Sequence, residues 1–157
     1  MKTIVFLFFF TLSINCLSQD LKGYSLGKKY NTDEIHTTVG GIPGLIQMGI
    51  LNDNTVYTIL FVPSEDGKHK KRLYSSEVDV LVNGFKKKFG LTKKLVVSKK
   101  YSKDKHLLQT INGIQYFISV KHNEYKDIPC DFVFSMTSLA LEKKKDEEKQ
   151  SKADNDF

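Results

Sequence analysis

The chain has 157 residues and a formal net charge of +6, from 24 lysines and arginines against 18 aspartates and glutamates. This length suffices for one ordinary domain with its own core and is too short for two comfortable ones. No apolar run reaches the roughly 20 residues that a membrane-spanning helix needs, which excludes a helical integral membrane protein.

Residues 1–18 have the three parts of a secretory signal peptide. Lys2 is the short positive region, an almost purely apolar run follows, and Cys16 and Ser18 are the small residues that precede a cut before Gln19. The sequence therefore predicts an exported protein, either periplasmic or secreted.

Cys16 leaves one alternative open, a lipoprotein anchored through this cysteine. The residue before the cysteine of a lipidation box is normally small, and here it is Asn15. Cleavage before Gln19 would remove Cys16 and leave Cys130 alone. The mature chain could then form no internal disulfide, and its fold would depend on its apolar core.

The first elements expected after the signal peptide are a lead-in at residues 20–27 and a brief helix. Asn31 or Thr32 could cap that helix, with Asp33 and Glu34 in its first turn, at the positive end of the helix dipole.

Residues 40–44, GGIPG, predict a turn or loop that ends any regular structure. A β-hairpin follows, with strands at 45–51 and 55–62 joined by the turn-forming residues 52–54. Residues 64–74 are polar and basic and predict an exposed loop.

The spacing of apolar residues predicts the main helix at residues 76–89. Ser76 with Asp79 forms an acidic variant of the capping box, and Gly90 stands where a left-handed C-terminal cap belongs. Gly84 costs this helix about 1 kcal/mol relative to alanine, which suggests that something packs close to it. The apolar stripe that the helix would bury is Val78, Leu81, Val82, Phe85 and Phe89.

The second half of the chain is lysine-rich and predicts further strands. Residues 95–97 form a short candidate strand. Residues 106–111 and 114–121 flank the Asn-Gly pair at 112–113, the strongest hairpin signal in the chain. A last strand is expected at 130–137.

These elements predict an α+β fold. It is a two-layer sandwich, in which an antiparallel sheet of about five strands carries the main helix and the short N-terminal helix on one face. The predicted single domain covers residues 19–141. Residues 142–157 form a charged tail with too little apolar surface to offset the entropy of ordering, so we expect it to be largely disordered.

Short motifs in this order of elements resemble a group of small exported bacterial domains. The lead-in has the form Gly-x-x-Leu-Gly at 23–27, the main helix ends in Lys-Phe-Gly at 88–90, and a β-rich strand at 132–138 leads into the tail. Over most of residues 21–141 the chain is similar in outline to the SmpA/OmlA-like outer-membrane assembly lipoproteins and to the β-lactamase-inhibitory-protein-like domains. That resemblance implies an α+β domain that binds other proteins and catalyses nothing. The chain differs from the lipoproteins in lacking a proper lipidation box.

No motif in the sequence assembles catalytic chemistry. The histidines are scattered singly without metal-ligand spacing, so we expect no metal and no cofactor. Cys130 could be a nucleophile with His106 or His122 as its base, but its place on the aromatic-rich face of a strand favours a buried core thiol. We therefore expect that the protein is not an enzyme; an active site assembled from distant residues is the remaining alternative.

The sheet face that the helices leave open is the first candidate binding surface. Period-2 alternation puts Phe117 and Ser119 on this face of one strand, and Val133 and Ser135 on the same face of its expected neighbour. Phe117 beside Val133 would be an apolar centre in a polar setting, the anatomy of a modest protein interface. The sequence thus predicts a protein partner. The alternative is that the basic loops fold over this face and it binds nothing.

The basic clusters are a second candidate surface, for a polyanion such as an acidic polysaccharide, lipid headgroups or nucleic acid. Charge runs are more often solvated faces without a partner. The residues that could form one positive patch are Lys68, Lys70, Lys71, Arg72, Lys86, Lys87, Lys88, Lys93 and Lys94.

Overall fold

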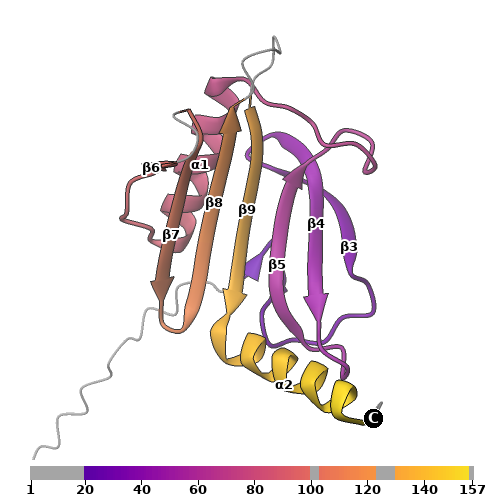
Figure 1. Cartoon of the computed structure of the whole chain (residues 1–157). Helices are drawn as coiled ribbons and strands as arrows, with labels where there is room; N and C mark the ends of the chain where they lie inside the picture. Colours follow the sequence, from indigo (N-terminus) through magenta and orange to yellow (C-terminus); the bar gives the residue numbers. More distant parts are fainter. Residues whose placement is uncertain (1–19, 100–102, 123–129, 156–157) are drawn as a thin grey trace, which may run out of the picture.

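A computed structural model describes residues 20–99, 103–122 and 130–155 (Figure 1). Its strands are β1 (Asp20–Leu21), β2 (Tyr24–Ser25), β3 (Glu34–Val39), β4 (Ile42–Ile50), β5 (Val56–Pro63), β6 (Val96–Val97), β7 (Lys105–Ile111), β8 (Ile114–His122) and β9 (Cys130–Ser138). Its helices are α1 (Ser75–Phe89) and α2 (Leu139–Asn155). Seven strands form one antiparallel sheet in the order β3-β4-β5-β9-β8-β7-β6, and β1 pairs with β2 separately.

The predicted class is confirmed, because the chain combines an antiparallel sheet with helices. The expected count of about five strands and the short N-terminal helix are wrong in detail. The segment with Asp33 and Glu34, expected to begin that helix, leads directly into strand β3. Ile35, Thr37 and Val39 are β-branched and alternate with exposed residues along this strand. The β propensity and the pairing with β4 therefore outweigh the local capping signals.

The glycine-rich segment at 40–44 is a hairpin turn followed at once by strand. Gly40 and Gly41 have φ of 59° and 80°, the positive values that both central residues of a tight hairpin turn need. Pro43 and Gly44, which were expected in a loop, already belong to β4 and pair with Thr38 and Thr37 of β3.

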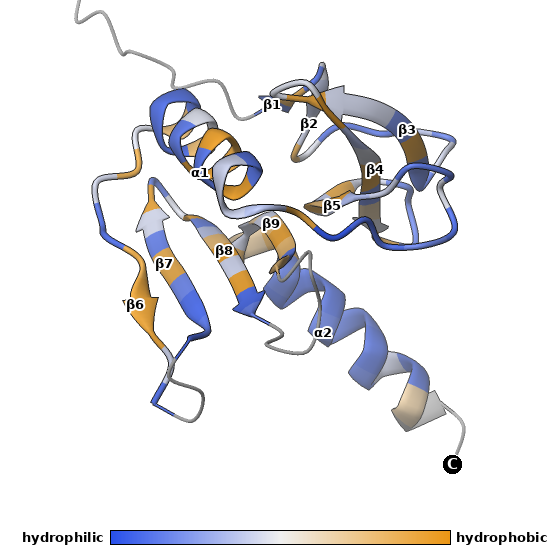
Figure 2. Ribbon diagram, turned by 90° about the horizontal axis from the view of Figure 1, so that it is seen from above, coloured by the Kyte–Doolittle hydropathy of each residue, from blue (hydrophilic) through white to orange (hydrophobic). Residues whose placement is uncertain are grey.

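Helix α1 packs on the sheet through the predicted stripe, whose members are all buried. In Figure 2 the apolar side of α1 faces the sheet and its hydrophilic side faces away. Phe85 stacks on Phe134 of β9 with 3.9 Å between the ring centroids. Gly90 has φ of 65° and closes the helix as the predicted left-handed cap. The helix starts one residue earlier than predicted: the Glu77 carboxylate, not the Ser76–Asp79 pair, accepts the hydrogen bond from the backbone N–H of Tyr74 (2.9 Å).

The two halves of the chain join in the middle of the sheet, where β5 pairs with β9. Residues more than 70 positions apart come together there, as with Phe61 opposite Phe134. The hairpin predicted around Asn112 and Gly113 is confirmed as β7–β8, and both turn residues have positive φ. This pairing puts β9 at the centre of the sheet and β6 at one edge.

The charged tail, expected to be largely disordered beyond residue 141, is helical as α2 up to Asn155. It is hydrophilic almost throughout and crosses the sheet end at which β9 finishes (Figures 1 and 2). The loop at 52–54 holds it: the backbone N–H of Asn52 donates to Glu148 Oε2 (3.1 Å), and Lys144 Nζ lies 3.4 Å from Asp53 Oδ2. These polar contacts to a distant loop stabilise α2, which has few apolar side chains to bury.

The predicted signal peptide, residues 1–18, lies outside the described residues. Within the described ranges, neither helix is long and apolar enough to span a membrane.

Candidate functional site

The sheet face opposite α1 is the surface on which the predicted interface residues lie. Tyr116, Ile118, Phe132 and Phe134 are buried on the α1 side, so the odd-numbered residues between and beside them point to the other side. We call that other side the open face. Figure 2 shows the sheet edge-on, with α1 on one side and the open face on the other.

The register of β8 and β9 places the four predicted residues in one block. Phe117 is directly opposite Ser135, and Ser119 is directly opposite Val133. Phe117 and Val133 are therefore diagonal neighbours, within reach of each other's side chains. All four are partly buried, so these side chains form a flat surface and do not protrude from it.

The apolar centre extends to two residues that sequence reasoning did not single out. Leu108 of β7 is directly opposite Phe117, and Leu60 of β5 is directly opposite Ser135. Leu108 is 47% exposed, which is unusual for a leucine in the interior of a sheet strand. Alternation along β7 was the signal that could have identified Leu108. The signal for Leu60 is tertiary, because it depends on the pairing of β5 with β9.

A polar row borders this centre on the α2 side. Thr58 pairs with Thr137, and their hydroxyls are hydrogen-bonded at 2.7 Å. Gln115 is opposite both Thr137 and Thr110, which continues the row across β8 and β7. An apolar centre with a polar rim is the usual anatomy of a protein interface.

The loop between β5 and α1 covers the far end of the open face. Gly67 packs against the His36 ring of β3. Ser64 Oγ accepts the backbone N–H of Gly67 (2.9 Å) and donates to the carbonyl of His69 (2.7 Å). Leu45, opposite His36 in the sheet, is only 6% exposed although it lies on the open face. The alternative of a covering basic loop therefore holds for the β3–β4 end, while Leu108 at the other end stays exposed.

A charged pair stiffens the tip of this loop. Asp66 Oδ2 lies 2.6 Å from His69 Nδ1, and Asp66 Oδ1 accepts the backbone N–H groups of His69 and Lys68. The hydrogen bond from the His69 ring, with those from the backbone, holds the pKa of Asp66 well below its usual range, and the same carboxylate raises the pKa of His69.

A hollow of about 100 Å³ separates the loop from β8 and β9, and it is lined by lysines and by open-face residues. Its charged residues are Lys70, Lys71 and Lys121 and one carboxylate, that of Asp131, which is paired with Arg72; Ser119 and Val133 form the floor. One end of the apolar centre therefore meets a small basic hollow.

The basic residues proposed as one patch are divided among three places. The group from Lys68 to Arg72 lies on the open-face loop, whereas Lys86, Lys87 and Lys88 are in the last turn of α1 on the opposite side of the sheet. Lys93 Nζ donates to the carbonyl of Leu108 (3.1 Å), at the β7 side. Several of the charges are also paired: Lys71 with Glu65 and Glu77, Arg72 with Asp131, and Lys88 with Asp20.

Cys130 and His122 are neighbours, as the nucleophile hypothesis requires. They are paired across β8 and β9, with 3.8 Å between Cys130 Sγ and His122 Nδ1. The thiol is nevertheless buried, with 5% of the residue exposed, and burial raises the pKa of Cys130. A raised pKa reduces the thiolate fraction at neutral pH, which is the opposite of what a nucleophile needs. His106, the other proposed base, lies on the open face opposite Ser119.

We expect a thiol reagent to label Cys130 slowly in native buffer and rapidly in denaturant, because burial and the raised pKa act in the same direction. The measurement is the labelling rate against pH. Native labelling as fast as that of the unfolded chain would mean an accessible thiolate and would restore the Cys130–His122 pair as a candidate active site.

Comparison with known proteins assigns no family to this chain. Among the described residues, His, Cys, Asp and Glu form no group of three that could hold a metal ion. The resemblance to the SmpA/OmlA-like and β-lactamase-inhibitory-protein-like domains stays an expectation based on element order. No family model, no curated protein and no solved structure matches the chain.

Proposed function

We propose that this chain is a small exported binding domain without enzymatic activity, and that its partner is another protein in the cell envelope or outside the cell. Export rests on the signal-like features of residues 1–18. The observation that carries the binding function is the apolar centre of Leu60, Leu108 and Phe117 on an open face with a polar border.

The open face also suggests the chemistry of the partner. An apolar side chain of the partner would lie on Phe117 and Leu108, as at the desolvated centre of known interfaces. Beside it, Lys70 and Lys121 line the basic hollow, which suits an acidic side chain. Lys71 and Arg72 in the same region already have acidic partners, so they position the loop more than they attract a ligand.

Affinity capture from the native envelope fraction, at low and at high salt, tests this function. We expect Phe117→Asp and Leu108→Asp to abolish capture of the partner, because each puts an unpaired charge in the desolvated centre. Thr110→Asp is the matched control, since Thr110 is an exposed residue of the same face and strand as Leu108 but lies in the polar row. Capture by the unmodified chain should change little with salt.

A polyanion is the second candidate partner, favoured by the lysines around the basic hollow. A complex of that kind should weaken steeply and linearly in log salt concentration. Replacing Lys86, Lys87 and Lys88 together by glutamate should leave protein capture intact, because these lysines lie on the other side of the sheet. If replacing Lys70 and Lys121 by glutamate abolishes capture while Phe117→Asp leaves it unchanged, the protein interface is wrong and the polyanion function replaces it.

A further inference from the structure

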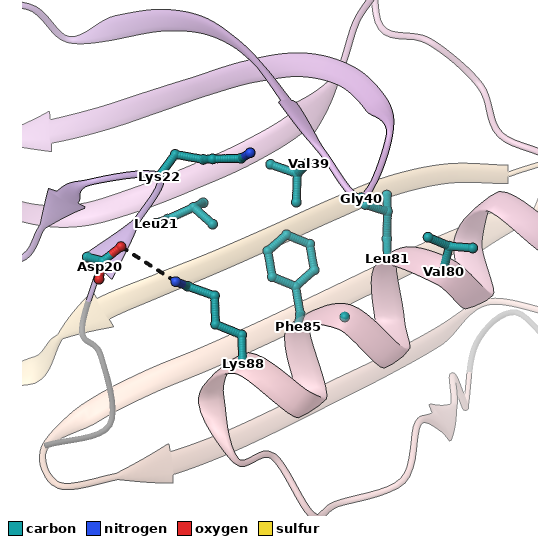
Figure 3. Close-up of a pocket in the computed structure, with 10 residues that line it drawn as sticks. Asp20, Leu21, Lys22, Val39, Gly40, Val80, Leu81, Phe85 and Lys88 are labelled. Atoms are coloured by element: carbon teal, nitrogen blue, oxygen red, sulfur yellow. Dashed lines mark ion pairs between the residues drawn. The ribbon is translucent and has the colours of Figure 1, made fainter. Parts of the chain in front are cut away.

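A second concave site lies on the α1 side of the sheet, away from the open face. It is a pocket of about 350 Å³ between α1, the β1–β2 turn and the β3–β4 turn (Figure 3). This volume is at the lower end of the range for small-molecule sites. Leu21, Val39, Leu81 and Phe85 supply its apolar walls, and each comes from a different part of the chain or a different turn of the helix.

Gly84 forms one wall of this pocket. A Cβ atom added there would have no neighbour within 4 Å, so no described group needs the space that the missing side chain leaves. The expectation that something packs close to Gly84 is therefore wrong for the described residues. A mid-helix glycine destabilises a helix by about 1 kcal/mol relative to alanine. Here the absence of a side chain at Gly84 leaves the pocket open along α1.

Two further residues shape the pocket. Val80, at its rim, is 51% exposed. Like Gly23, whose φ is 87°, Lys22 has the positive φ (57°) that both central residues of the tight β1–β2 turn need. Figure 3 shows its side chain extended across the pocket above Leu21, toward Val39. The pocket therefore combines apolar walls with a lysine side chain, a combination that suits a ligand with an apolar part and an acidic part.

The charges at the pocket are two lysines and one carboxylate. Lys88 Nζ lies 3.5 Å from Asp20 Oδ1, and Figure 3 shows this ion pair at the end of the pocket near β1. None of the described carboxylates lies within ion-pair distance of the Lys22 ammonium group. Beside the Lys88–Asp20 pair, Lys22 therefore adds a positive charge that no described carboxylate neutralises.

We propose that this pocket binds a free amphiphile with a single alkyl chain and a carboxylate head group, that is, a short or medium-chain fatty acid. The alkyl chain lies along Leu81, Phe85 and the gap at Gly84. The carboxylate lies at the Lys22 ammonium group and competes with Asp20 for Lys88. The ligand thus covers the apolar walls and neutralises the positive charge with the same molecule.

The test uses octanoate and 1-octanol as matched probes in an NMR titration of the ¹⁵N-labelled full domain. We expect octanoate to shift amide signals of the pocket residues and to bind more tightly than octanol. Lys22→Gln should weaken octanoate binding by about two- to five-fold, the range for a partly exposed ion pair, and leave octanol binding unchanged. Asp20→Asn should strengthen octanoate binding, because it removes a like charge and frees Lys88.

Gly84→Leu is the steric test, because the leucine side chain would fill the pocket from α1. We expect it to abolish binding of both probes. Asn83→Leu is the matched control: it adds the same side chain at an exposed neighbouring position that does not line the pocket. Retention of octanoate binding by Gly84→Leu, or equal affinities for octanoate and octanol with no effect of Lys22→Gln, would overturn the proposal. Lys22 is exposed, so its variant tests the site even if Gly84→Leu does not fold.

Discussion

Replacing Phe85 by alanine is expected to lower the free energy of unfolding by about 3–5 kcal/mol. The residue is 2% exposed, and its ring lies between those of Phe61, Phe89, Phe132 and Phe134, with centroid separations of 3.9 to 6.3 Å. Alanine would leave a cavity at the point where α1 meets β5 and β9. The surrounding rings belong to a sheet and a helix and can close that cavity only in part.

Chemical denaturation followed by circular dichroism measures this effect. Val80→Ala is the matched control, because Val80 lies on the same helix with about half of its surface exposed. It should change the denaturation midpoint little, since alanine also has the higher helix propensity. A midpoint for Phe85→Ala that coincides with that of Val80→Ala would show that the ring is not part of the core.

Gly44→Ala is expected to destabilise the protein by about 1–3 kcal/mol or more. A Cβ atom at this position would lie 2.6 Å from Phe61 Cε2 and 2.6 Å from the carbonyl oxygen of Val62. The aromatic ring is packed in the core and the carbonyl belongs to the paired strand β5, so neither can move aside cheaply. The cost is steric, because Gly44 is not among the residues with positive φ.

Gly84→Ala supplies the contrasting result. Nothing lies within 4 Å of the added Cβ atom, so the substitution should stabilise the protein by up to about 1 kcal/mol through helix propensity and reduced freedom of the unfolded chain. Thermal denaturation of the two variants in parallel checks both signs. Stabilisation by Gly44→Ala would mean that β4 and β5 are further apart than the structure has them.

The two proposed sites lie on opposite sides of one sheet and would serve different ligands. The open face has its apolar centre on β5, β7, β8 and β9, whereas the pocket lies between α1 and two turns. Phe117→Asp and Gly84→Leu should therefore act independently, the first on protein capture and the second on octanoate binding. Residues this far apart without shared partners normally show additive effects.

Local signals were sufficient for the elements whose stability is mainly local. Spacing of apolar residues predicted the buried stripe of α1, and Gly90 and the Asn112–Gly113 pair predicted a helix cap and a hairpin turn. Alternation along β8 and β9 likewise placed Phe117 and Val133 on one face, because side chains in a strand have a period of two. Each of these features depends on residues only a few positions apart, so it can be recognised in the sequence alone.

Contacts between distant residues decided the rest. Residues 31–34 carry helix-start signals, but β3 begins at Glu34, because pairing with β4 satisfies the backbone groups of residues 34–39. Residues 142–155 have too little apolar surface to order alone, and they are helical where Asn52 and Asp53 hold them. The apolar centre gained Leu60 through the pairing of β5 with β9, and the environment of Gly84 followed from where the β1–β2 and β3–β4 turns lie. In each case the deciding interaction joins segments far apart in the chain, and local sequence carries no information about which segments will meet.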